Sequence, residues 1–172
     1  DENVSPKDFA EFVSNHKPED KQEALRQKEL SIIYQLYSDT CLKQQMLDFG
    51  DQIVLCIKLL ESRPEIKKIL KRKYQFIMVD EYQDTNHAQS YLLKLLVNKQ
   101  QNIMVVGDDD QSIYRFRGAA VSNILKFMEE YPNAKQIVIR KNYRSSQKVL
   151  DQAYRLIQNN NPYRLEIRNK LN

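Results

Sequence analysis

Two acidic side chains directly follow a short apolar run, an arrangement that suits metal-dependent phosphate chemistry. In "FIMVDEYQDTN", residues 76–86, four apolar residues precede Asp80 and Glu81. A carboxylate at the end of a strand can hold Mg²⁺, and a neighbouring carboxylate can orient or deprotonate an attacking water. A divalent metal would also relieve the repulsion between the two acids. On its own the pair is a weak signal, because many strands end in a solvated polar turn.

Two further polar clusters follow apolar runs later in the chain. "VVGDDDQ", residues 105–111, ends in Gln111, whose amide can donate to or accept from a phosphate or its water. "IVIRKNYR", residues 137–144, ends in Arg144, which could neutralise charge on a transferred phosphoryl group or form a salt bridge to one of the acids. We expect the three clusters to converge on one crevice.

The elements that must position these clusters alternate between strands and helices. The short apolar runs at 76–79, 103–106 and 137–139 are typical of strands that are covered on both faces. Helical patterns lie between them, and Ser145 or Ser146 can cap a further helix after the third run. This order predicts an α/β fold with a parallel sheet and flanking helices, in which ligands bind at the carboxyl ends of the strands.

The residues before the first strand carry a helical pattern. Apolar side chains recur at helical spacing between Leu25 and Tyr37 and again between Phe49 and Leu60. Pro64 marks the start of another short helix. The sequence therefore predicts an all-helical segment ahead of the sheet.

Composition bounds the class of protein. With 172 residues, 41% of them hydrophobic and 29% charged, the chain can build one core, or one core and a smaller helical lobe. Its apolar runs are far shorter than the ~20 residues of a membrane span, and no signal peptide is evident. We therefore expect no membrane association and a cytoplasmic location.

The net charge of +4 is distributed unevenly. Residues 131–172 carry only two acidic side chains, Asp151 and Glu166. The basic side chains of the same segment are Lys135, Arg140, Lys141, Arg144, Lys148, Arg155, Arg164, Arg168 and Lys170. Such an excess can attract the phosphates of a nucleotide or of a nucleic acid, although an ordinary solvated face has the same composition.

Three motifs together carry a specific resemblance. "VDEYQDTN", "VVGDDDQSIYRFRGA" and "RKNYRSS" resemble, in this order and at these separations, motifs II, III and IV of the Rep/UvrD/PcrA-type superfamily 1 DNA helicases. "LDFGDQI", residues 47–53, is similar to a segment that precedes motif II in that family. The resemblance covers nearly the whole chain. It implies a partial RecA-like fold of the P-loop NTPase type, with ATP and Mg²⁺ as cofactors and single-stranded DNA and ss/ds DNA junctions as partners.

The resemblance also implies roles for single residues at the nucleotide. Asp80 resembles the Walker B aspartate that holds Mg²⁺, and Glu81 resembles the glutamate that activates water for ATP hydrolysis. Both carboxylates, Asp80 and Glu81, are expected at the metal. Gln111 matches the glutamine that senses the γ-phosphate. Arg144 matches an arginine that contacts that phosphate, and Tyr143 is similar to a tyrosine that stacks on adenine.

Motif III is expected to reach the DNA as well. Tyr114 and Phe116 match aromatic residues that line the path of the single strand, and Arg117 matches a basic residue beside them. Stacking of a base on an aromatic ring contributes roughly 1–3 kcal/mol and is indifferent to sequence. Phe116 stands where these helicases commonly have tryptophan, so we expect weaker stacking there. Without the motif, both aromatic residues would be interpreted as core.

The phosphate-binding loop of such a motor has no counterpart here. The glycines are Gly50, Gly107 and Gly118, from which no GxxxxGK[ST] loop can be built. The resemblance therefore implies a piece of a longer protein. We expect residues 1–46 to be the helical part of an insertion subdomain and residues 47–172 to be a partial motor domain without its Walker A portion. The last ~25 residues are expected to lead into the second motor domain.

We expect the full-length parent to hydrolyse ATP, translocate on single-stranded DNA and unwind duplex, and the isolated chain to be inactive. Three other interpretations stay open at this point. The chain could be a non-motor DNA-binding module with a degenerate nucleotide site. The acids could instead form a two-metal nuclease site, which needs carboxylates around two metals about 4 Å apart. A purely structural role would explain the helical first half but not the polar strand ends.

Overall fold

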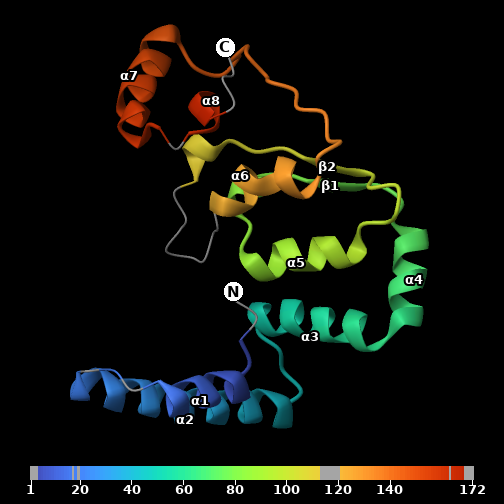
Figure 1. Ribbon diagram of the computed structural model, residues 1–172, viewed down its shortest axis with the longest axis vertical. Helices are drawn as coiled ribbons and strands as arrows, with labels where there is room; N and C mark the ends of the chain where they lie inside the picture. The colour runs from blue at the N-terminus through green and yellow to red at the C-terminus, as the bar shows by residue number, and fades with distance from the viewer. Residues whose placement is uncertain (1–3, 17, 19, 113–120, 163, 169–172) are drawn as a thin grey trace. The chain divides into compact units, whose positions relative to one another are not determined.

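The computed structural model describes residues 4–16, 18, 20–112, 121–162 and 164–168. Helices dominate, and the described strands form one small sheet (Figure 1). Within the described residues, four helices precede the first strand: α1 (Pro6–Asn15), α2 (Lys21–Lys43), α3 (Phe49–Ser62) and α4 (Pro64–Lys73). Then come β1 (Ile77–Val79), η1 (Tyr82–Asp84, a 3₁₀ turn), α5 (His87–Leu96), β2 (Ile103–Val105), η2 (Asp109–Gln111, also 3₁₀), α6 (Val121–Glu130), α7 (Gln147–Ile157), η4 (Gln158–Asn160) and α8 (Leu165–Arg168).

The chain divides into two compact units, of which the first is helical. It comprises Asp1–Lys73 and His87–Leu96. In it α1 lies along α2, and α3 packs against α5 (Figure 1). Asp48 caps α3 through a reciprocal pair of bonds with Asp51, where the sequence indicated a break between helices. Ile57 and Leu60 of α3 are fully buried and form the core of this unit. The predicted helical segment before the sheet is thus confirmed.

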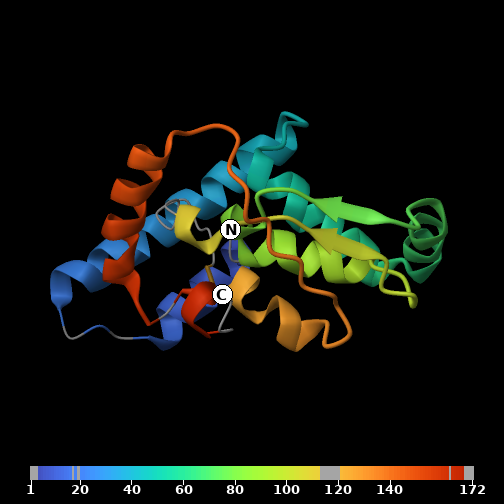
Figure 2. The same cartoon turned by 90° about the horizontal axis from the view of Figure 1, so that it is seen from above.

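The second unit, Tyr74–Asn86 with Val97–Asn172, holds the sheet. β1 and β2 pair in parallel, with Ile77 opposite Ile103 and Val79 opposite Val105 (Figure 2). Because two parallel strands point the same way, their carboxyl ends lie at the same edge. These are the first two strands that the apolar runs predicted, so the α/β class and the parallel pairing are confirmed.

The third predicted strand does not form. Residues 134–142 have no regular secondary structure, and Ile137 and Ile139 are 75% and 82% exposed. An apolar run shows that a segment can form a strand, but a strand exists only where its backbone pairs with a neighbour. Among the described residues, none pairs with this segment. The prediction that Arg144 follows a sheet strand is therefore wrong.

No helix in the described ranges is both long and apolar enough to cross a membrane.

Candidate active site

The segment that leaves β1 is fastened to the end of β2 by backbone bonds. Val106 N donates to Val79 O at 2.8 Å, and Tyr82 N donates to Val106 O at 2.9 Å. Between these bonds, Glu81 adopts φ 49° and ψ 44°, in the left-handed region. That conformation is uncommon for a residue other than glycine and costs about 1–3 kcal/mol. The surrounding bonds hold it, and both Asp80 and Glu81 remain exposed.

A buried glutamine joins the two strand ends. Gln83 is 1% exposed, and its Nε2 donates to Oε2 of Glu81 at 2.6 Å. Its Oε1 accepts a bond from the backbone N–H of Asp108 at 3.0 Å. Both ends of the buried amide are thereby satisfied, as a buried polar group requires. The first two predicted clusters are therefore brought together through one side chain.

The segment after β2 is a tight polar turn that carries Gln111. Asp108 caps η2, since its Oδ1 accepts a bond from Asp110 N at 3.0 Å. The other oxygen of Asp108 accepts from Gln111 Nε2 at 2.8 Å. Gln111 N also donates to Asp108 O at 3.0 Å. The exposed amide of Gln111 is thus held by the turn in which it lies.

Gly107 permits the close approach of the two strand ends. A Cβ at this position would lie 2.7 Å from Oε1 of Gln83 and 2.9 Å from Cδ1 of Ile124. The requirement that the structure shows is one of space, since any side chain would displace the amide that links β1 to β2.

Replacing Gly107 with alanine in the 172-residue chain is expected to lower the free energy of unfolding by about 1–3 kcal/mol, the usual cost of overpacking. Gly50→Ala is the matched control, because its Cβ would meet only Oδ1 of Asp48, at 3.2 Å, in the first turn of α3. Thermal unfolding followed by circular dichroism measures both variants. Equal melting temperatures for Gly107→Ala and the unaltered chain would contradict the close packing.

Side chains of α6 support the segment that follows Glu81. The ring of Tyr82 meets Phe127 edge-on at 5.6 Å, and Phe127 lies 4.8 Å from Tyr131. Asn123, only 8% exposed, donates through Nδ2 to Thr85 O at 3.0 Å and to Asn86 O at 3.2 Å. An aromatic cluster therefore holds the acidic segment at the first residue of η1, and a buried amide holds it just after η1.

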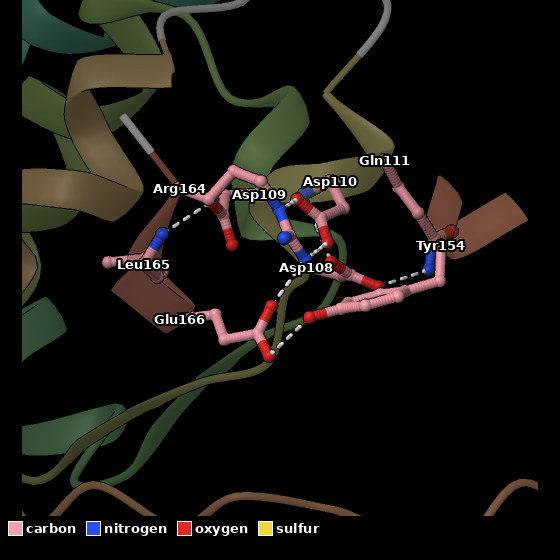
Figure 3. Close-up of polar contacts among 8 residues, drawn as sticks. All are labelled: Asp108, Asp109, Asp110, Gln111, Tyr154, Arg164, Leu165 and Glu166. Carbon is pink, nitrogen blue, oxygen red and sulfur yellow. Dashed lines mark hydrogen bonds and ion pairs between the residues drawn. The ribbon is translucent and has the colours of Figure 1, made fainter. Parts of the chain in front are cut away.

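Three consecutive acids, Asp108, Asp109 and Asp110, bring ligand atoms within 4.8 Å of one another. Their carboxylates already accept hydrogen bonds, and Asp110 forms a salt bridge with Arg164 at 2.6 Å (Figure 3). Burial raises the pKa of Asp109 above its ordinary value. These contacts favour a structural role for the three acids over a two-metal site. They also remove Arg164, which is 5% exposed, from the basic side chains available to a nucleic acid.

A family model described as the UvrD/REP helicase N-terminal domain matches residues 2–132. The chain belongs to the UvrD/REP helicase family. It is 50% identical over 131 residues to the ATP-dependent DNA helicase PcrA of Bacillus subtilis, a match that covers 76% of this chain and 18% of that protein.

Proteins of the same name from staphylococci are also similar. The PcrA helicases of Staphylococcus epidermidis and Staphylococcus aureus are each 44% identical over 163 residues, covering 90% of this chain and 22% of theirs. The chain thus spans about a fifth of the length of these UvrD/REP relatives. The resemblance stated from the three motifs is confirmed at the level of the family.

The motif IV residues of this UvrD/REP family chain lie in an exposed turn. Oδ1 of Asn142 accepts bonds from Arg144 N at 2.9 Å and from Ser145 N at 2.8 Å. Tyr143 is 90% exposed, and the Arg144 side chain forms no hydrogen bond or ion pair with a described residue. Among the described residues, Arg144 therefore forms no ion pair with Asp80 or Glu81. Ser146 occupies the cap position of α7, but its side chain makes no capping bond.

The residues predicted to contact DNA, Tyr114, Phe116 and Arg117, lie outside the described residues.

Sequence reasoning missed three residues that shape this UvrD/REP family site: Gln83, Asn123 and Arg164. Gln83 lies two positions after Glu81, but a glutamine in an acidic turn is expected to be exposed to solvent, so nothing in the sequence indicated its burial. Asn123 is a polar residue beside apolar residues in a stretch with a helical pattern, which could have marked it as a buried donor. The burial of Arg164 carried no local signal, because Asp110, with which it forms two parallel bonds, lies 54 residues earlier in the chain.

Proposed function

We propose that this chain is part of the motor of an ATP-dependent DNA helicase. The full-length parent would use a RecA-like pair of domains to hydrolyse ATP, translocate on single-stranded DNA and unwind duplex at ss/ds junctions. Membership of the UvrD/REP family supports the class, and so do relatives named ATP-dependent DNA helicases. The observation that carries the proposal is the hydrogen-bonded link from Glu81 through Gln83 to the turn that holds Gln111.

Asp80 is the residue proposed to hold Mg²⁺. Its carboxylate is exposed, and only Oδ1 accepts a bond, from Glu81 N at 2.9 Å. Oδ2 has no partner among the described residues, so one hard oxygen ligand is available, which suits this ion. Bound with ATP, Mg²⁺ would neutralise charge on the β- and γ-phosphate oxygens.

Glu81 is proposed to activate the attacking water. Gln83 occupies one oxygen of the carboxylate, Oε2, so Oε1 is left to accept a proton from water. The left-handed backbone at Glu81 and the buried partner fix the side chain before the substrate arrives. Such preorganisation is what a general base requires, because misplacement lowers the rate steeply.

Three further residues are proposed to contact the nucleotide: Gln111, Arg144 and Tyr143. Gln111 would exchange its bond with Asp108 for one with the γ-phosphate, and Arg144 would neutralise charge developing on that phosphate. Tyr143, 90% exposed, would offer its ring to adenine. The ring of Tyr143 and the guanidinium of Arg144 make no hydrogen bond or ion pair with a described residue, which suits contact with a ligand held between two domains.

Motif III would then couple the phosphate to DNA. The residues proposed to touch the single strand, Tyr114, Phe116 and Arg117, follow Gln111 within a few positions. A displacement of Gln111 between ATP and ADP states would shift them with it. This coupling favours a motor over a module that only binds DNA.

The test is ATP hydrolysis by the full-length parent and by the isolated 172-residue chain, each with and without single-stranded DNA. We expect DNA-stimulated hydrolysis and unwinding from the parent and no turnover from the chain, because the phosphate cradle is not among its 172 residues. A parent that binds DNA but shows no ATP turnover would favour the binding module. DNA cleavage with metal and without ATP would favour the nuclease.

A further inference from the structure

The segment at α8 fastens onto the acidic turn that carries Gln111. Arg164 meets Asp110 with two parallel bonds, Nε to Oδ1 at 2.7 Å and NH2 to Oδ2 at 2.6 Å (Figure 3). The backbone N–H of Leu165 donates to Oδ2 of Asp109 at 2.8 Å. Arg164 thus binds Asp110, and the next residue, Leu165, binds Asp109.

The environment of Arg164 fixes its orientation. NH2 also lies 2.7 Å from Oε2 of Glu166, and the guanidinium lies over the ring of Tyr154, 5.3 Å from its centre. The hydroxyl of Tyr154 donates in turn to Oε1 of Glu166 at 3.2 Å. The carboxylates of Asp110 and Glu166 balance the charge of Arg164. Because Arg164 is only 5% exposed, water screens these charges little.

The contact between Arg164 and Asp110 also constrains Gln111, because Asp110 and Gln111 belong to the same turn. Asp110 is the middle residue of η2, and Gln111 is the last. A turn of three residues closed by the bond from Gln111 N to Asp108 O leaves little freedom for one member to move without the next. The position of Asp110 therefore determines the position of the Gln111 backbone.

We propose that Arg164 is a positioning residue for Gln111, and that it ties the segment following motif IV to the proposed phosphate sensor. This inference rests on the proposed function. Arg144 lies in the turn just before α7, and Arg164 lies just beyond η4 at the other end of that helix. The α7 segment that follows Arg144 is thereby joined to the turn that carries Gln111.

The chemistry predicts a graded response to substitution at Arg164. Alanine would leave Asp109, Asp110 and Glu166 close together without a cation, so the turn would open. Lysine would keep the charge but lose the planar fork that makes two parallel bonds with Asp110. Alanine should therefore displace Gln111 more than lysine does.

The test uses the full-length parent with Arg164→Ala, Arg164→Lys, Asp110→Asn and the double variant Asp110→Asn with Arg164→Ala. Arg155→Ala is the matched control, an exposed arginine in the last turn of α7. The kcat for ATP is measured with and without single-stranded DNA, together with the KM for ATP and the melting temperature. We expect DNA stimulation of kcat to fall about tenfold in Arg164→Ala, within the usual range of coupling between sites, and less in Arg164→Lys.

Asp110→Asn should reproduce much of the loss, and the double variant should lose no more than Arg164→Ala alone, because both changes break one contact. A lower melting temperature with unchanged DNA stimulation would mean that Arg164 only stabilises the fold and would overturn the inference. Additive losses in the double variant would overturn it too. Should Arg164→Ala fail to fold, Arg164→Lys and Asp110→Asn decide the matter in the same way. An unaltered parent without DNA-stimulated hydrolysis would instead show that the proposed function itself is wrong.

Discussion

Replacing Glu81 with glutamine in the full-length parent is expected to lower ATP turnover about 10²–10⁴-fold, the usual contribution of a general base. Binding of ATP should be largely kept, because glutamine has the same shape and its Oε1 can still accept the bond from Gln83. The neutral amide cannot take a proton from water. Steady-state hydrolysis and equilibrium binding of a fluorescent ATP analogue measure the two effects separately.

Glu129→Gln is the control for this substitution. Glu129 is an exposed carboxylate in α6, which belongs to the same unit, and the same loss of charge there should leave turnover unchanged. If Glu81→Gln abolished nucleotide binding as well as turnover, the residue would be a ligand of the nucleotide or its metal and not the base.

Gln111→Ala should impair DNA-stimulated hydrolysis and unwinding far more than it impairs DNA binding. A lost hydrogen bond to a charged group is worth about 1.5–3 kcal/mol, which is roughly a 10- to 150-fold loss of rate. The alanine removes the amide and its bond to Asp108, while η2 keeps its backbone bonds. Hydrolysis, strand separation and DNA affinity are measured on one preparation so that the three losses can be compared.

Gln147→Ala supplies a matched control. Gln147 Nε2 donates to Oδ1 of Asp151 at 2.8 Å, the same kind of exposed bond at the same distance as that of Gln111, but in α7. All three activities should survive that change. Equal losses of hydrolysis, unwinding and DNA binding in Gln111→Ala would show that the residue maintains the fold and couples nothing.

The first two strands and the helices were predictable because their signals are local. The runs at 76–79 and 103–106 contain β1 and β2, and the pattern that begins at Pro64 matches α4. The meeting of Asp80 and Glu81 with the Gln111 turn followed from a general property of parallel strands, whose carboxyl ends share one edge. Periodicity and topology thus suffice to locate the first two polar clusters.

Other features depend on partners that no local pattern reveals. The run at 137–139 has the composition of a strand, yet it stays irregular because no described backbone pairs with it. Gln83 and Arg164 are polar residues whose burial depends on acceptors and donors brought from distant segments. Charge counting placed Arg164 among solvated cations, whereas its place in the fold is set by Asp110. The burial of such side chains can be predicted only when the residues at both ends of each contact are known.

The amide of Gln83 has a direction. Its NH₂ end faces a carboxylate and its carbonyl end faces a backbone N–H, so half a rotation would set donor against donor and acceptor against acceptor. A connector with such polarity cannot exchange its two partners. Both bonds form only while the two loops keep one relative position, so a shift of the loop at Asp108 would strain the bond between Gln83 and Glu81.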